Sequence, residues 1–275
     1  MMTKPLNIAH RGGAALWPEN TLFAFVSAAE AGYDGAELDV QLTRDGKLVV
    51  FHDFRLKPGL CRHADGRWLR REGRKPLPLI RDSTLAELQA FDVGRPKPGT
   101  LYARTHRRLS PRDGERMPSL SEVIAGVRAA KKDFRLFIEI KTSLTGRSIS
   151  ARPEAVAEAV IAQLRAASFL EHAVMVGFDW AGLIHAKRLA PDLRCWFSTA
   201  SGSRVRIEPI KQAGGEGWFC SLDRAGARAV QKARALGLEF GVWTVNRPSD
   251  MRALAALGVD AICTDRPDRL KTLLS

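Results

Sequence analysis

Short runs of apolar residues alternate along the chain with longer stretches in which apolar residues recur every three or four positions. Runs of the first kind predict β-strands, and stretches of the second kind predict amphipathic helices. The predicted strands are 6–10, 36–42, 47–52, 135–141, 173–178, 194–199, 217–222, 238–245 and 259–264. Helical patterns lie between most of them, for example at 21–31, 120–131, 153–167, 180–189 and 225–236. This alternation indicates an α/β fold built from β/α units around a largely parallel sheet.

The number of predicted strands is one more than a closed eight-stranded barrel needs. Only the turn sequence TRDG separates the second strand from the third, so we expect these two to form a hairpin. The remaining strands and the length of 275 residues favour a (β/α)8 TIM barrel, in which the site lies at the carboxyl ends of the strands. An open doubly wound sheet is the alternative. Against it, no G-x-G-x-x-G follows the first strand, and the chain has no G-K-[ST] phosphate loop.

The formal net charge of +13 is concentrated in one part of the chain. Residues 54–116 hold 16 Lys and Arg against 7 Asp and Glu, a net charge of +9, and are rich in Pro and Gly. We therefore expect one barrel domain over residues 1–275, with 54–116 as a small subdomain inserted after the third strand. Aromatic residues are only 7% of the chain and do not alternate with the basic clusters, so no nucleic-acid partner is expected. A weak contact of the basic insertion with an anionic membrane surface stays open.

The cysteines and the lengths of the apolar segments indicate in which cellular compartment the protein is expected. Cys61, Cys195, Cys220 and Cys263 form no C-x-x-C pair and have no histidine at zinc-ligand spacing, which predicts reduced, mostly buried thiols. No apolar run of signal-peptide length precedes the first strand, and no apolar segment of 18 residues follows. We therefore expect a cytoplasmic protein without a transmembrane segment. Its oligomeric state is left open.

Polar residues gather where the first four predicted strands end. They are His10 and Arg11 at the first, Glu37 and Asp39 on the second, His52 and Asp53 at the third, and Glu139 and Lys141 at the fourth. Side chains two positions apart in a strand share a face, so both residues of the second and of the fourth pair should point into the barrel. The intervening Leu38 and Ile140 should then face the helices.

Three carboxylates at one barrel mouth would repel each other unless a positive charge lay among them. Oxygen ligands without cysteine favour a hard divalent cation, Mg²⁺ or Ca²⁺, over zinc. The alternative is a buried salt-bridge network in which the carboxylates pair with Arg11 and Lys141. Three carboxylates, two cations and two histidines at four successive strand ends favour a functional site over a purely structural network.

The histidines separate into two groups. His63, His106, His172 and His185 lie in predicted loops or helices, where we expect surface or packing roles. His10 and His52 lie at strand ends, and two groups that titrate near neutral pH suit a reaction in which one proton is removed and another delivered. A metal ion with Arg11 and Lys141 would neutralise a phosphate. Together these residues predict cleavage of a phosphodiester.

The stretches HRGGAALWPENT, GAELDVQLTRDGKLVVFHD, FIEIK, VWTVN and CTDRP occur in this order. In them the chain closely resembles the glycerophosphodiester phosphodiesterase family over nearly its whole length. The first two blocks are long and specific, whereas E-I-K and T-D-x-P would be weak alone. The resemblance implies a (β/α)8 barrel that hydrolyses glycerophosphodiesters, such as glycerophosphocholine or glycerophosphoethanolamine, to glycerol 3-phosphate and an alcohol.

Roles for individual residues follow from the same resemblance. It implies that Glu37, Asp39 and Glu139 hold the metal, that His10 and His52 are the acid/base pair, and that Arg11 and Lys141 bind the phosphate. Trp243, at the end of the eighth predicted strand, is either a contact for the glycerol moiety or a core aromatic of the barrel wall. Glu19 and Asn20 either take a direct part in catalysis or serve only the start of the first helix. In the second case Asn20 is the cap, and Glu19 lies near the positive end of the helix dipole.

Other functions remain to be weighed against this one. The insertion after the third strand is longer and more basic than is usual in the family, which puts the substrate in doubt. A lysophospholipase D-like enzyme that acts on membrane-derived lipids is therefore an alternative. A binding module without catalysis is a weaker one, because none of the residues expected of the site is missing from the chain.

Overall fold

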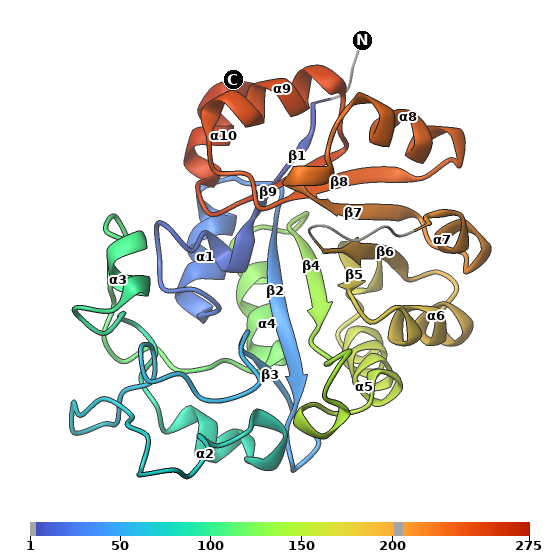
Figure 1. The fold of residues 1–275 in the computed structure, drawn as a ribbon. Coiled ribbons are helices and arrows are strands. Elements are labelled where there is room, and N and C mark those ends of the chain that lie inside the picture. The colour runs from blue at the N-terminus through green and yellow to red at the C-terminus, as the bar shows by residue number, and fades with distance from the viewer. Residues whose placement is uncertain (1–3, 201–205) are drawn as a thin grey trace.

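Eight parallel strands close into a barrel in the computed structural model, which describes residues 4–200 and 206–275. The barrel strands are β1 (Leu6–Ala9), β2 (Gly35–Leu42), β4 (Arg135–Ile140), β5 (Ala173–Gly177), β6 (Arg194–Thr199), β7 (Gly217–Ser221), β8 (Glu239–Trp243) and β9 (Ala261–Thr264). Closure comes from β1, which pairs in parallel with β2 on one side and with β9 on the other. The predicted (β/α)8 TIM barrel is confirmed (Figure 1).

One further strand, β3 (Leu48–Val50), lies outside the ring of eight barrel strands. It pairs antiparallel with the second half of β2, with Val40 opposite Val50 and Leu42 opposite Leu48. The turn between the two strands contains Gly46 at a φ of 71°, a left-handed conformation that glycine adopts without strain. The predicted hairpin is confirmed, and it returns the chain from the tip of β2 toward the barrel mouth.

Helices surround the strands (Figure 1). Around the barrel lie α1 (Leu22–Glu30), α4 (Leu120–Ala130), α5 (Pro153–Ala166), α6 (Trp180–Leu189), α7 (Glu208–Gln212), α8 (Ala227–Ala235), α9 (Pro248–Leu257) and α10 (Pro267–Leu274). The start of α4 is fixed by a capping box between Ser119 and Glu122. The expected cap of α1 is wrong by one residue, because Thr21 and not Asn20 accepts the hydrogen bond from the amide of Ala24.

The alternation of side chains along the strands produces two apolar layers. Leu38 and Ile140 point outward and are fully enclosed between the strands and the helices, as predicted. Phe137, Trp196 and Phe219 point inward and fill the barrel, with the rings of Phe137 and Trp196 packed edge to face at 5.3 Å between centroids. This packed interior separates the mouth of the barrel from its opposite end.

Residues 54–116 lie to one side of the barrel and contain two short helices, α2 (Leu85–Gln89) and α3 (Leu101–Thr105) (Figure 1). The segment packs on a small apolar cluster apart from the main core, which includes Leu56, Ile80 and Leu88. It returns beside the place where it leaves, since the amide of Val50 donates to the carbonyl of Pro118 at 2.8 Å. Within the described residues, no helix combines the length and the apolar character that crossing a membrane requires.

Candidate active site

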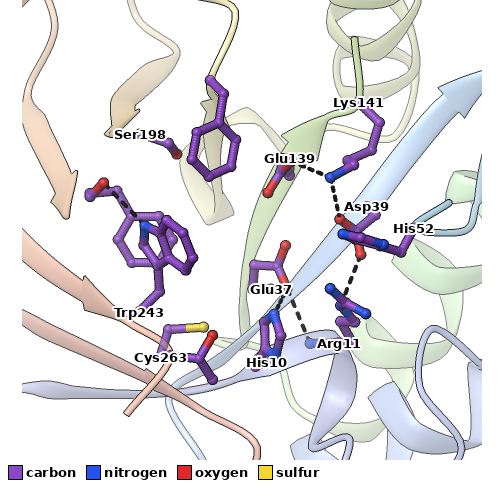
Figure 2. A pocket seen from close by; sticks show the side chains of 13 residues that line it. His10, Arg11, Glu37, Asp39, His52, Glu139, Lys141, Ser198, Trp243 and Cys263 are labelled. Carbon is purple, nitrogen blue, oxygen red and sulfur yellow. Dashed lines mark hydrogen bonds and ion pairs between the residues drawn. The ribbon is translucent and has the colours of Figure 1, made fainter. Parts of the chain in front are cut away.

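Three carboxylates converge at the mouth of the barrel. Glu37 and Asp39 come from β2 and Glu139 from β4, where Asp39 and Glu139 are paired neighbours in the sheet register. One oxygen from each carboxylate lies within 4.8 Å of the others. Figure 2 shows the three side chains turned into one cavity, whose volume is about 230 Å³. The same-face prediction for the E-x-D pair is thus met by the observed geometry.

Burial makes this concentration of negative charge costly. Glu37 and Asp39 are only 3% and 1% exposed. Burial, followed by repulsion from Asp39 and Glu139, raises the pKa of Glu37 well above its usual range. Burial would raise the pKa of Asp39 as well, but the charges of Arg11 and Lys141 outweigh it and the pKa is lowered. The mouth therefore retains an excess of carboxylate oxygens that a further cation would stabilise.

Arg11 and Lys141 lie among these carboxylates. The Nζ of Lys141 is 2.8 Å from Oε1 of Glu139 and 3.5 Å from Oδ1 of Asp39. Burial opposes the charge of Lys141, yet Glu139 and Asp39 raise its pKa, so the ammonium is retained. The Nε of Arg11 is 3.4 Å from Oδ2 of Asp39, without the geometry of a hydrogen bond. Within the described residues this buried N–H has no hydrogen-bond acceptor.

The backbone after β1 explains the position of Arg11. A 3-10 turn, His10–Gly12, ends the strand, and its Arg11 has a φ of 49°. Gly12 and Gly13 follow with φ values of 84° and 102°. A Cβ on Gly12 would lie 2.7 Å from the Cβ of Ala24 in α1, so only glycine allows this approach. The turn directs the amide of Arg11 to Oε2 of Glu37, 3.1 Å away.

His10 is held by a carboxylate that the sequence analysis did not identify. Its Nδ1 lies 2.6 Å from Oδ1 of Asp265, at the end of β9, while its Nε2 lies 3.8 Å from Oε2 of Glu37. Burial opposes ionisation of Asp265, but its hydrogen bond with His10 lowers the pKa of the carboxyl. An ionised Asp265 accepts a hydrogen bond from Nδ1–H of His10, and this contact directs Nε2 of the ring to the cavity.

His52 is arranged in the same way at another edge of the cavity. Its Nδ1 lies 2.9 Å from Oδ1 of Asp53, and Oδ2 of Asp53 lies 3.0 Å from Nζ of Lys57. Burial opposes ionisation of Asp53, but the hydrogen bond from His52 and the charge of Lys57 lower its pKa to about 2. The β2–β3 hairpin makes this placement possible, because the amide of Phe51 donates to the carbonyl of Asp39.

All eight predicted site residues line this one cavity, including Trp243. The Trp243 ring packs edge to face on Phe178, with 5.3 Å between centroids, and its Nε1 donates to the carbonyl of Phe219. In Figure 2 Trp243 lies at the left of the cavity, and Lys141 and Asp39 lie at the right. The cavity thus has an apolar, aromatic wall and a charged wall.

Several further residues complete the site. Asn246 donates to Oδ2 of Asp265 at 2.6 Å and accepts from the Asp265 amide at 2.9 Å. Both lie in the short motifs VWTVN and CTDRP, so those motifs carried a usable signal. Asn20 donates to Oδ2 of Asp39 at 2.8 Å. By contrast, nothing in the sequence indicated that Tyr102 would reach Glu19.

A parallel barrel whose mouth joins a carboxylate cluster to two cations and two carboxylate-bound histidines is typical of hydrolases that act on phosphate esters. A sequence model of the glycerophosphoryl diester phosphodiesterase family matches residues 10–269. The chain belongs to this family and is a phosphodiester-cleaving enzyme, a glycerophosphodiester phosphodiesterase.

Individual relatives agree over nearly the whole chain. A glycerophosphodiester phosphodiesterase of Caldanaerobacter subterraneus subsp. tengcongensis is 32% identical over 282 residues, which cover 98% of each protein. The crystal structure of a Silicibacter pomeroyi protein, provisionally assigned to the glycerophosphoryl diester phosphodiesterases, is similar with a TM-score of 0.90 and 31% identity, covering 98% of this chain and 93% of that one. An Oleispira antarctica phosphodiesterase, solved with the product sn-glycerol-3-phosphate, shares the fold at 24% identity and a TM-score of 0.75, covering 98% and 97%.

Proposed function

We propose that the enzyme hydrolyses small glycerophosphodiesters, such as glycerophosphocholine and glycerophosphoethanolamine, to glycerol 3-phosphate and an alcohol, with a divalent cation and two catalytic histidines. The convergence of the carboxylates of Glu37, Asp39 and Glu139 beside His10 and His52 carries this proposal. The product found in the Oleispira antarctica relative supports the choice of glycerol 3-phosphate.

The donor set fits a hard divalent cation. Glu37, Asp39 and Glu139 each offer a carboxylate oxygen, and the buried position of the first two leaves their charge in need of compensation. Oxygen-only ligands suit Mg²⁺ or Ca²⁺. When bound, the cation would act as a Lewis acid that neutralises charge on the phosphate oxygens. Burial, followed by repulsion from Asp39 and Glu139, raises the pKa of Glu37, and this uncompensated charge supports the role.

Arg11 and Lys141 are proposed to bind the phosphate. Both are more than four-fifths buried at the cavity and keep their charges through the neighbouring carboxylates. A guanidinium and an ammonium on one side of a phosphodiester would stabilise the charge that grows on its oxygens as the bond to the alcohol breaks.

His10 and His52 are proposed to move the protons. Asp265 and Asp53 each bind an Nδ1, so each ring can present Nε2 to the substrate. One histidine removes the proton of the attacking hydroxyl, either from water or from the glycerol itself, and the other protonates the departing alcohol. Trp243 would pack against the carbon skeleton of the glycerol on the apolar wall.

We also propose that residues 54–116 are an insertion in an otherwise simple barrel. Their separate apolar cluster and their return to the point of departure support this. A cytoplasmic location is proposed on the four cysteines, which are all buried as free thiols. Contact of the basic segment with an anionic membrane surface stays a prediction.

Release of glycerol 3-phosphate from glycerophosphocholine tests the function. The wild-type protein is assayed after treatment with EDTA and after addition of Mg²⁺ or Ca²⁺, beside Glu37→Gln and His52→Ala. His185→Ala is the control, because His185 binds Glu158 on the outside of the barrel. Cation-dependent release that both site variants lose, and the control keeps, supports the proposal. Release of choline from lysophosphatidylcholine, with lysophosphatidate as the other product and no cleavage of glycerophosphocholine, would favour the lysophospholipase D-like alternative. Cleavage of neither compound would contradict the proposed substrates.

A further inference from the structure

A second cavity, of about 420 Å³, adjoins the active site without being part of it. Five arginines line it, and we call it the arginine groove: Arg104, Arg107, Arg108, Arg266 and Arg269. The first three belong to α3 and the residues after it, and the last two to the loop after β9 and to α10. The groove therefore lies where the basic segment 54–116 meets the barrel. It reaches the active site at Asp265, which lines the groove and binds His10.

The charges of the groove are not balanced from within the protein. Asp265 is the one acidic residue in the lining, and both its oxygens are engaged, by His10 and by Asn246. Arg266 is paired with Asp268. Within residues 4–200 and 206–275, Arg104 and Arg108 form no salt bridge. Like charges around one concave surface raise the local positive potential, and an anion that enters lowers it.

The two walls of the groove are held in place by specific contacts. On the segment side, the ring of Tyr102 stacks on His106 at 4.1 Å between centroids, and its hydroxyl binds Glu19. The amide of Ser110 donates to the carbonyl of Leu16 at 2.9 Å. On the barrel side, Nη1 of Arg269 donates to the carbonyl of Asn246 at 3.2 Å. The arginines thus extend from supported backbone, which reduces the entropy lost on binding a ligand.

The chemistry of the lining selects among anions. Guanidinium groups form paired, charge-assisted hydrogen bonds with phosphate oxygens. Stacking of nucleic-acid bases would need aromatic faces, and His106 is the single aromatic side chain in the lining. A cavity of about 420 Å³ is larger than a phosphate needs, so there is room for the group that carries it.

We propose that the arginine groove binds a phosphate group other than the one cleaved in the mouth. The phosphate can come from three sources: a second phosphate on the alcohol part of the substrate, a separate phosphate ester, or a lipid headgroup. The chemistry of recognition is the same in each, and the experiment separates them. The proposed phosphate site in the groove does not depend on the proposed roles of His10, His52 or the metal ligands.

The test compares two double variants of the full-length protein. Arg104→Ala/Arg108→Ala removes two cations from the groove. Arg70→Ala/Arg74→Ala removes the same charge from exposed positions of the same segment, outside the groove. Inorganic phosphate is titrated into each protein by calorimetry. We expect the groove variant to bind one phosphate fewer per chain, or to bind it at least about tenfold more weakly than the control, since charge-assisted hydrogen bonds are lost.

Equal phosphate binding by the two variants would overturn the proposal. Turnover of glycerophosphocholine by the control variant is measured separately, so a failure of the proposed function is not mistaken for a failure of the groove. Two further arms identify the source. Weaker flotation of the groove variant with vesicles of phosphatidylcholine and phosphatidylglycerol identifies a lipid headgroup. A lower kcat/KM for a glycerophosphodiester with a phosphorylated alcohol, relative to glycerophosphocholine, identifies the substrate. If the groove variant loses phosphate binding but keeps both its vesicle flotation and its relative kcat/KM, the phosphate belongs to a separate phosphate ester.

Discussion

Tyr102 donates its phenolic hydroxyl to Oε2 of Glu19 at 2.6 Å, across 83 positions of the chain. Oε1 of the same carboxylate lies 3.0 Å from Nη1 of Arg11, the side chain that we propose binds the phosphate. Burial, followed by the charge of Glu19, raises the pKa of Tyr102, so its hydroxyl stays a donor at neutral pH. The basic segment is thus linked through one carboxylate to the active site.

Tyr102→Phe removes this hydrogen bond while keeping the ring. Glu19 then loses one of its two partners, and Arg11 is held less firmly. We expect KM for glycerophosphocholine to rise about fivefold, the equivalent of about 1 kcal/mol for one hydrogen bond, with a smaller change in kcat. Tyr33→Phe is the control, because Tyr33 precedes β2 at the opposite end of the barrel. Equal effects of both substitutions on KM would contradict a positioning role for Tyr102.

Asp265→Asn tests how the orientation of His10 is maintained. An amide at this position keeps the shape of the side chain but no longer favours a proton on Nδ1 of His10. We expect kcat to fall by about 10² to 10⁴, as for the buried carboxylate behind the histidine of a catalytic triad. Asp53→Asn should lower kcat less, because the distance to His52 is longer, 2.9 Å against 2.6 Å, and the side chain is 33% exposed against 18%. A kcat within twofold of the wild type for Asp265→Asn would count against catalysis by His10.

Asp53 should also make stability depend on pH. Its pKa is lowered to about 2 in the folded protein, below the ordinary value of about 3.9 in an unfolded chain. The ionised carboxylate therefore stabilises the fold above pH ~4, and this contribution is lost as the pH falls toward 2. We expect Asp53→Asn to lower the free energy of unfolding at pH 5 and pH 7, and to lower it less at pH 3. Urea titrations at the three values measure this, and a difference that does not vary with pH would refute the linkage.

Gly12→Ala is expected to be costly for two separate reasons. The φ of 84° is strained for alanine, and the new Cβ would lie 2.7 Å from the Cβ of Ala24. Gly46→Ala is the matched control, because its φ of 71° is also positive but no atom lies within 4 Å of the added Cβ. Strain alone should cost about 1–2 kcal/mol at Gly46. The steric overlap should add about 1–3 kcal/mol at Gly12, and equal costs in denaturant titrations would show that α1 yields to the added methyl group.

The strands and most of the site could be predicted because they depend on local patterns. Glu37 and Asp39 share a face through the period of two in β2, wherever the strand lies in the fold. The end of β1 was visible from the glycines that follow Arg11. The sequence does not choose the cap of α1, because asparagine and threonine both cap helices well. In the structure the side chain of Asn20 donates a hydrogen bond to Asp39, and Thr21 caps the helix instead.

The sequence by itself determined the order of β/α units, the hairpin after β2, and which polar residues end each strand, since each of these follows from periodicity or from a turn. Only the tertiary structure decided that Asp265 binds His10, that Tyr102 reaches Glu19, and that arginines from two distant segments line one groove. Contacts of this kind depend on closure of the barrel and on the path of residues 54–116. That path is set by packing between residues far apart in the chain, which no local pattern encodes.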